Sequence, residues 1–227
     1  TQNISDCGVS DGKITITAIP GTAPVQYSID NGLSWSNSGV FSGLAPGSYQ
    51  VKARNNTGNC IVSWSGNPVV LTSPLPPVLQ SVTVTGLSNC GSNDGQIVIQ
   101  AQQGSAPTEY SINNGTSWQA TGTFSSLTPG NYNVKIRNNN NTCVVSWPNN
   151  PVTVTTPTPA VIQSVTVTGL SDCGSNDGQI VIQAQQGSAP TEYSINNGTS
   201  WQGSGTFTNL TPGNYNVKIR NNNNTCV

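Results

Sequence analysis

The chain repeats itself with a fixed period of 83 residues, and this period constrains its fold more than any other feature. Three sets of residues keep the spacing: Cys7, Cys90 and Cys173; Cys60, Cys143 and Cys226; and Trp35, Trp118 and Trp201. This period is too long for one turn of a solenoid but long enough for a small β domain. We therefore expect three repeats, at residues 1–74, 75–157 and 158–227. The first strand of repeat 1 and the last strand of repeat 3 are cut short, which indicates a window on a longer chain.

Each repeat has the pattern of an all-β domain. Residues 81–87 and 96–102 alternate with period two and are rich in β-branched residues, and residues 131–137 place Tyr132, Val134 and Ile136 on one face. Seven or so short strands in about 80 residues predict an immunoglobulin-like β-sandwich. The Pro-Gly turn before Tyr132 predicts a tyrosine corner, the alternative being an ordinary core tyrosine after a turn.

The composition excludes several classes of function. The net charge is −1 and only 7% of residues are charged, so nucleic acid is a poor partner. There is no histidine, which excludes Ser-His-Asp and Cys-His catalysis, and no apolar run near 18 residues, so we expect no membrane span. We expect no enzyme activity, cofactor or metal. Asp94 is interpreted as an Asx turn rather than a ligand. Lys135 and Arg137 are interpreted as a solvated face or a cross-strand pair with Glu109 rather than as an anion or sugar contact.

The six cysteines predict disulfides in an oxidising compartment, and the lack of a C-x-x-C pair argues against zinc. Two pairing schemes are open. Pairing within repeats would join Cys7–Cys60, Cys90–Cys143 and Cys173–Cys226. An immunoglobulin topology would instead put the two cysteines of a repeat at opposite ends, roughly 25 Å apart, whereas a disulfide needs Cα atoms within about 7 Å. That geometry favours pairing between repeats, as Cys7–Cys143 and Cys90–Cys226.

The loop "NNNNTC" before Cys143 and Cys226 is interpreted as a hairpin turn, because asparagine tolerates left-handed backbone. Seven asparagines also lie in sequons and are candidate N-glycosylation sites: Asn3, Asn55, Asn114, Asn140, Asn197, Asn209 and Asn223. Covalent or bound glycans are therefore candidate partners, and the Thr-rich joints could carry sugar as well. Trp35, Trp118 and Trp201 follow an "NGxSW" turn; exposed rings there would suggest carbohydrate stacking, and buried rings would mean packing.

Two stretches resemble a known family. "DGQIVIQAQQGSAPTEYSINNG" (residues 94–115) and "LTPGNYNVKIRNNNNTC" (residues 127–143) are similar to the SprB-type repeat of giant surface proteins of Bacteroidetes. The chain departs from that pattern at Thr108-Glu109 and at the hairpin, where Arg137 and four asparagines replace an acidic turn, which weakens any calcium site. The resemblance implies secretion, an extracellular location on the bacterial surface and a role in adhesion or gliding. It carries no catalytic residues.

Two hypotheses follow. The first is a structural tandem-repeat segment of a surface fibre or adhesin stalk, with neighbouring repeats and a self-assembled filament as partners. The alternative is a set of carbohydrate-binding modules. The Pro-marked joints after residues 71 and 154 predict short, fairly stiff connections. We therefore expect an extended array with roughly 35–45 Å per repeat, from strands of about eight residues at ~3.3 Å each plus loops and joint.

Overall fold

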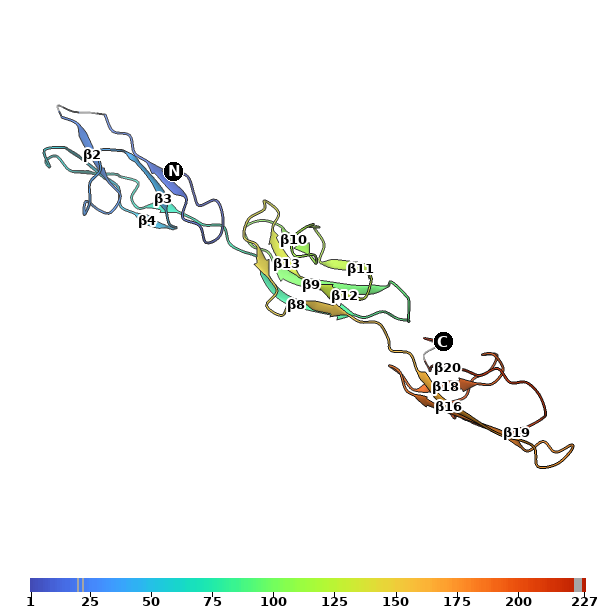
Figure 1. Cartoon of the computed structure of the whole chain (residues 1–227). Coiled ribbons are helices and arrows are strands. Elements are labelled where there is room, and N and C mark those ends of the chain that lie inside the picture. The colour runs from blue at the N-terminus through green and yellow to red at the C-terminus, as the bar shows by residue number, and fades with distance from the viewer. Residues whose placement is uncertain (20, 22, 223–225) are drawn as a thin grey trace. The chain divides into compact units, whose positions relative to one another are not determined.

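The computed structural model describes residues 1–19, 21, 23–222 and 226–227 (Figure 1). Those residues are all-β, as the sequence predicts: they form small antiparallel sheets and contain no helix. Within the described ranges, therefore, no helix is long and apolar enough to cross a membrane. Below, repeats 1, 2 and 3 denote residues 1–74, 75–157 and 158–227.

Repeat 1 has two layers of strands around one core. Its strands are β1 (Gly12–Thr15), β2 (Val25–Ser28), β3 (Val40–Leu44), β4 (Gly47–Tyr49), β5 (Lys52–Asn55), β6 (Val62–Ser63) and β7 (Val69–Leu71). β1 pairs with β3, β4 with β7, and β5 lies between β2 and β6. The buried core consists of Ile4, Ile14, Val51 and Leu71, which come from strands or loops of different sheets and hold them together.

Repeat 2 shows the complete set of strands. They are β8 (Val78–Thr85), β9 (Gly95–Gln102), β10 (Thr108–Ser111), β11 (Thr123–Leu127), β12 (Gly130–Tyr132), β13 (Lys135–Asn138), β14 (Val145–Ser146) and β15 (Val152–Val154). One sheet has the order β11-β9-β8 and another the order β10-β13-β14. These are the E-B-A and C-F-G orders of an immunoglobulin sandwich, so the predicted fold class is confirmed.

The strand expected at residues 131–137 is divided into β12 and β13. Between them, the side chain of Asn150 takes the place of a neighbouring strand. Its Oδ1 accepts the Val134 N–H at 2.8 Å, and its Nδ2 donates to the Val134 carbonyl at 2.8 Å. Asn67 makes the same pair of bonds to Val51 in repeat 1, at 2.8 and 2.9 Å. Both backbone groups of a buried residue are thus satisfied where the ladder changes partner, from β15 to β14.

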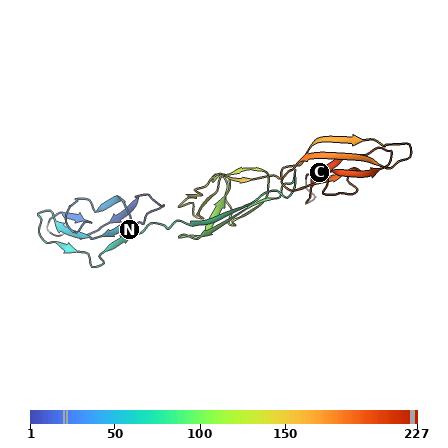
Figure 2. The same cartoon turned by 90° about the horizontal axis from the view of Figure 1, so that it is seen from below.

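Repeat 3 contains β16 (Val161–Thr168), β17 (Gly178–Gln185), β18 (Thr191–Ser194), β19 (Thr206–Leu210) and β20 (Lys218–Asn221). β17 lies between β16 and β19, and β18 pairs with β20. The long strands β16 and β17 run side by side (Figure 2), with Val165 opposite Ile182 and Ile162 opposite Ala184. The inward-facing Ile180 and Ile182 are buried, as are their counterparts Ile97 and Ile99 in β9.

The predicted tyrosine corner is present in all three repeats. The Tyr132 hydroxyl donates to the Thr128 carbonyl at 2.8 Å, and Tyr49 and Tyr215 bond to Ala45 and Thr211 at the same distance. This bond fixes the turn that leads into the F strand. It has a structural role, because the hydroxyl is committed to the backbone.

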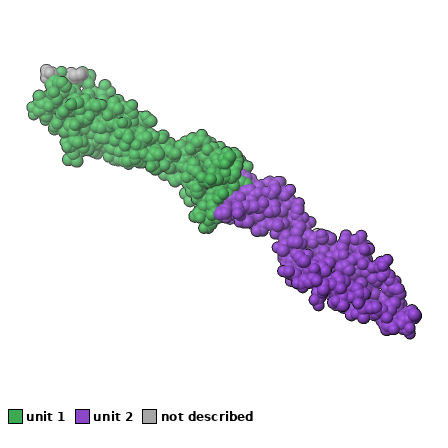
Figure 3. All heavy atoms as spheres, in the orientation of Figure 1, with its two compact units in different colours: residues 1–81, 100–122, 133–150 green, residues 82–99, 123–132, 151–227 purple. Residues whose placement is uncertain are grey.

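Close contacts divide the chain into two compact units whose limits differ from those of the repeats. Unit 1 comprises residues 1–81, 100–122 and 133–150, and unit 2 comprises residues 82–99, 123–132 and 151–227 (Figure 3). Unit 1 therefore joins repeat 1 to the F–G part of repeat 2. Unit 2 joins the A–B part of repeat 2 to repeat 3. Each unit contains one complete joint between neighbouring repeats.

Candidate functional site: the joint between repeats

Each joint is closed by a disulfide between neighbouring repeats. Cys7 bonds to Cys143 with a Cα–Cα distance of 4.9 Å, and Cys90 bonds to Cys226 with 5.0 Å. Of the two schemes that the sequence left open, the structure thus contains the inter-repeat one, and the within-repeat pairs do not form. The physical reason is the topology: the first cysteine lies in the A–B loop and the second follows the F–G hairpin. Cys60 and Cys173 are exposed and carry no disulfide in the described chain.

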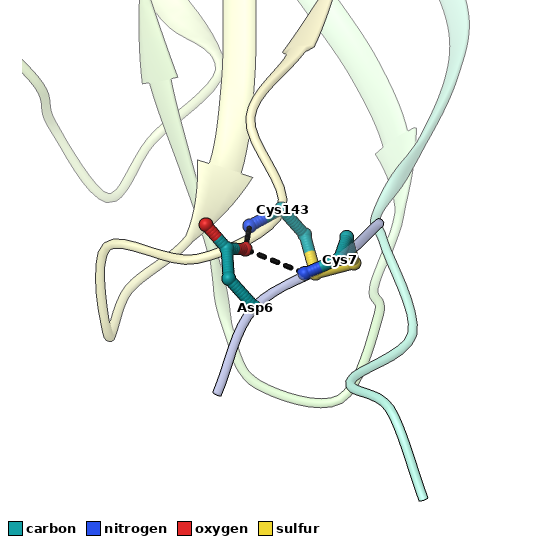
Figure 4. A group of neighbouring side chains, drawn as sticks. All are labelled: Asp6, Cys7 and Cys143. Atoms are coloured by element: carbon teal, nitrogen blue, oxygen red, sulfur yellow. Dashed lines mark hydrogen bonds between the residues drawn. A yellow bond between two sulfur atoms is a disulfide. The ribbon is translucent and has the colours of Figure 1, made fainter. Parts of the chain in front are cut away.

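A single side-chain oxygen bridges the two cysteine loops. Oδ1 of Asp6 accepts the Cys7 N–H at 2.7 Å and the Cys143 N–H at 2.6 Å (Figure 4). Cys143 has φ 57°, in the left-handed region, and its N–H is directed at this oxygen. Asn89 makes the same two bonds at the second joint, to Cys90 and Cys226, each at 2.7 Å. The amide oxygen of Asn89 accepts the same two hydrogen bonds as the carboxylate oxygen of Asp6. This position therefore requires a hydrogen-bond acceptor, but it does not require a negative charge.

Asp6, Cys7 and Cys143 also place three potential metal-binding atoms within 4.8 Å of one another. The two sulfur atoms are bonded to each other, so neither is a thiolate, which is the form that binds metal. The Asp6 oxygen is already shared by two N–H donors. This cluster is accounted for by the disulfide joint.

The first asparagine of the loop holds the linker between repeats. Asn138 is fully buried, and its Nδ2 donates to the Leu75 carbonyl at 3.1 Å. The same carbonyl accepts the Ser105 N–H at 3.0 Å. Asn221, also fully buried, donates in the same way to the Thr158 carbonyl at 3.1 Å. Two donors on one linker carbonyl fix the path of the chain as it enters the next repeat.

The other loop residues make the expected turn. The Asn138 N–H bonds to the Thr142 carbonyl at 2.9 Å, and Asn141 has φ 66°. Asparagine is among the few residues that adopt this conformation readily. The hairpin interpretation therefore holds for this loop, and the buried Asn138 adds a role that turn chemistry did not predict.

Glycine is required where the linker passes the loop between β9 and β10. A Cβ added to Gly104 would lie 2.2 Å from the Leu75 oxygen and 2.7 Å from the Pro76 carbonyl carbon. A Cβ on Gly187 would lie 2.1 Å from the Thr158 oxygen. These are backbone atoms that are themselves held by hydrogen bonds, so they cannot move aside cheaply. The linker is thus seated on the surface of the repeat that follows it.

A carboxylate shapes the loop that presents the first cysteine. Oδ1 of Asp94 accepts the Ser88 N–H at 3.0 Å and the Ser92 hydroxyl at 2.7 Å, and its Oδ2 accepts the Ser88 hydroxyl. The hydrogen bonds from the Ser88 and Ser92 hydroxyls, followed by that from the Ser88 N–H, lower the pKa of Asp94 to about 2. The same cause, from Ser171 and Ser175, lowers the pKa of Asp177 to about 2. The Asx-turn interpretation of Asp94 is wrong in its partners: the carboxylate bonds back across the loop to Ser88 and Ser92, whereas an Asx turn would bond to the backbone two residues further on.

These lowered pKa values predict acid sensitivity of the cysteine loops. A carboxyl that ionises more easily when folded contributes stability above its unfolded pKa, near 3.8, and that contribution is lost as the pH falls through about 2. We expect the melting temperature to fall between pH 5 and pH 2, and to fall less steeply in an Asp94→Asn, Asp177→Asn double variant. Melts followed by circular dichroism measure both slopes.

A matched control is Asp172→Asn, which installs the residue that Asn89 already provides in repeat 2. Its pH dependence should follow that of the unmodified chain. Parallel slopes for the unmodified chain and the double variant would contradict the role given to Asp94 and Asp177.

The three candidate ligand-contacting tryptophans are engaged by their own repeats. The guanidinium carbons of Arg54, Arg137 and Arg220 lie 4.2 Å from the ring centroids of Trp35, Trp118 and Trp201, respectively. Trp118 Nε1 donates to the Gly115 carbonyl at 2.9 Å, and Glu109 holds Arg137 through an ion pair of 2.8 Å. One ring face and the ring N–H are thus occupied. The half-buried rings pack against the "NGxSW" turn of their own repeat, which favours the packing interpretation over sugar stacking.

The candidate glycosylation sites differ in accessibility. Asn3, Asn114, Asn140, Asn197 and Asn209 are exposed, whereas Asn55 is half-buried. Asn114 and Asn197, each with φ 61°, lie at the tip of the "NNG" turn, where a glycan would meet little protein. Asn223 lies outside the described residues. Glycosylation of these sites stays a prediction.

Comparison with known proteins agrees with the resemblance seen in the sequence. Residues 1–34 match the SprB repeat family. This is a repeat of cell-surface proteins connected with adhesion and gliding, and it is structural rather than catalytic. No curated protein matches the chain. The matched stretch includes Cys7 and the strands β1 and β2, so it covers one half of the first joint.

Proposed function

We propose that the chain is a structural segment of a secreted fibre or adhesin stalk on a bacterial surface, built from tandem immunoglobulin-like repeats and without catalysis. The observation that carries this proposal is the joint, repeated with the same parts at both junctions. Each joint has an inter-repeat disulfide, a shared side-chain acceptor and a linker held by a buried asparagine.

The position of the disulfides supports a mechanical role. A disulfide inside a repeat would stabilise one domain, whereas these join each repeat to the next. Tension along the chain would otherwise act on the short linker at residues 74–77 alone. With Cys7 bonded to Cys143, the linker is bypassed by a covalent bond, and the joint cannot open until that bond breaks. Disulfides persist outside the cell, which agrees with surface exposure.

Carbohydrate binding is the weaker alternative, because one face of each candidate tryptophan is covered by arginine. Glycans enter the proposal as covalent decoration on exposed sequons instead. The partners we propose are the neighbouring repeats of the same chain and, beyond them, other copies in a filament.

Small-angle scattering tests the proposal directly. Three repeats in line at roughly 35–45 Å each should give a particle with a longest dimension of roughly 105–135 Å. We expect this value together with no affinity on a glycan array. A compact particle would contradict the stalk. Glycan binding that is lost in Trp118→Ala and Trp201→Ala would instead support the alternative.

A further inference from the structure

The two inter-repeat disulfides overlap along the sequence: Cys90 lies between Cys7 and Cys143, and Cys143 lies between Cys90 and Cys226. The overlap creates two separate covalent paths along the chain, each made of one backbone segment and one disulfide. We propose that these paths give the protein a further function, as a tether with a fixed maximum length. The use of such a tether rests on the stalk function proposed above, whereas the paths follow from the bonds alone.

The first path crosses the joint between repeats 1 and 2 through a disulfide. It runs from Thr1 to Cys7, across the bond to Cys143, and then along the backbone to Cys173. This backbone segment contains β15, the linker between repeats 2 and 3, and β16. Residues 8–142 are bypassed. Because this path is the shortest covalent connection between Thr1 and Cys173, a chain pulled at those two residues becomes taut along it.

The second path crosses the two joints in the opposite way. It follows the backbone from Cys60 to Cys90, through β7, the linker at residues 74–77 and β8, and then crosses the disulfide to Cys226. The two paths have no residue in common. At each joint, the linker therefore belongs to one path and the disulfide to the other, so two independent covalent connections carry the tension.

The paths contact each other where they cross a joint. Sγ of Cys7, on the first path, lies 3.2 Å from the carbonyl oxygen of Pro74, on the second. At the next joint, Sγ of Cys90, on the second path, lies 3.2 Å from the carbonyl oxygen of Pro157, on the first. The side-chain acceptor shared by each cysteine pair adds two hydrogen bonds in parallel with the S–S bond. Tension thus passes from one backbone to the next at a point that several interactions hold.

The core strands of repeat 2 lie on neither path. Residues 91–142 contain the strands from β9 to β13, and both paths bypass them. The buried side chains of Ile97, Ile99, Val134 and Ile136 belong to this segment. Tension that straightens the two paths therefore does not pull on the strands that build the core.

The maximum length of the first path follows from covalent geometry. Residues 1–7 and 143–173 together provide about 36 residue steps of at most ~3.3–3.6 Å, and the disulfide adds a Cα–Cα distance of 4.9 Å. The path therefore cannot exceed roughly 125–135 Å. The backbone alone, with about 172 steps between the same two ends, could reach roughly 570–620 Å. The disulfide thus lowers the maximum extension about 4.5-fold.

Optical tweezers test the first path on the full 227-residue chain. Cys60→Ser leaves Cys173 as the exposed thiol for one handle, and the other handle is attached to the amino group of Thr1. Without reductant, we expect the extension to stop at roughly 125–135 Å. Adding Cys7→Ser with Cys143→Ser should raise this limit to roughly 475–515 Å, where the second disulfide sets the new maximum.

The matched control removes the other disulfide. Cys90→Ser with Cys226→Ser takes away as many cysteines, but the first path does not use them. The extension between Thr1 and Cys173 should therefore still stop at roughly 125–135 Å. A longer extension in this control, or an extension beyond roughly 135 Å in the chain with both disulfides intact, would overturn the proposal.

The second path is tested with handles on Cys60 and Val227 in a Cys173→Ser chain. Its limit is roughly 105–120 Å, and only the replacement of Cys90 and Cys226 should lengthen it. A limit that responds to the other disulfide would contradict the arrangement in two paths. Scattering is measured without tension, so a compact particle there would contradict the stalk proposal and leave the two paths standing.

Discussion

Removing one inter-repeat disulfide should lower the free energy of unfolding of the joined repeats by about 2–4 kcal/mol. The variant is Cys7→Ser with Cys143→Ser, so that no thiol remains to form a new pair. The bond joins residues that are 136 positions apart, so its loss raises the conformational entropy of the unfolded chain. In the folded protein, the linker is then the only covalent connection between the two repeats. Cys143 is also only 3% exposed, so the serine hydroxyl must find a partner in a buried place. Calorimetry measures the change.

The chain offers a matched control for this experiment. Cys60→Ser with Cys173→Ser removes the same number of cysteines, but both are exposed and unpaired within the described chain. This variant should melt at the same temperature as the unmodified protein. Digestion without reductant should release peptides joined through Cys7–Cys143 and Cys90–Cys226. A peptide that joins Cys7 to Cys60, or an equal loss of stability in the control variant, would refute the joint.

The fold was predictable because its signals are local and repeated. Alternation at residues 96–102 and 131–137 identified β9 and the F strand, and the Pro-Gly-x-Tyr sequence identified the tyrosine corner. The disulfide pairing was predicted only in part, because the sequence left the within-repeat and inter-repeat schemes open. A strand of eight residues is long enough to separate Cys90 from Cys143, which favoured a partner in a neighbouring repeat.

The parts of the joint that sequence reasoning missed depend on contacts between distant residues. Asn138 and Leu75 are 63 residues apart, and nothing in the run of asparagines distinguishes the buried first member from the exposed ones. Asp6 and Asn89 differ in charge but share one role, because only their Oδ1 is used. Asn150 was also missed, although its counterpart Asn67 stands at the same step from the F strand. A recurring polar residue at a fixed step from an apolar strand was the available signal.

The stacking of arginine on tryptophan was not predicted from the sequence. The pairing of Glu109 with Arg137 was one of the interpretations that the sequence left open, and the register places the two residues opposite each other. The position of Trp118 under the same guanidinium depends on how the "NGTSW" turn folds back. The turn conformation itself requires glycine: Gly115 has φ 88°, and a Cβ there would lie 3.1 Å from Trp118 Cζ2. Local sequence therefore indicated the Glu109–Arg137 pair, whereas the contact of Arg137 with Trp118 depends on the tertiary structure.

The second large loss of stability is expected from Gly104→Ala, which adds a single methyl group. Gly104→Ala places a Cβ 2.2 Å from the Leu75 oxygen, so the linker must leave its seat. The hydrogen bonds of that carbonyl to Asn138 and Ser105 would then break, and the buried Pro77 would be exposed. Overpacking costs about 1–3 kcal/mol, and each lost hydrogen bond about 1 kcal/mol. We expect a total loss of about 3–5 kcal/mol in the stability of repeat 2, measured by urea denaturation.

The repeat itself supplies the control for this substitution. Gly21→Ala makes the same chemical change at the equivalent position of repeat 1, where a Cβ meets nothing within 4 Å. Its effect should be close to zero, or slightly stabilising, because alanine restricts the unfolded chain more than glycine does. Gly187→Ala should behave like Gly104→Ala, since its Cβ would lie 2.1 Å from the Thr158 oxygen. Equal losses at Gly21 and Gly104 would mean that the glycines serve the loop conformation and not the linker. A loss confined to Gly104 and Gly187 would establish that each seated linker stabilises the repeat that receives it.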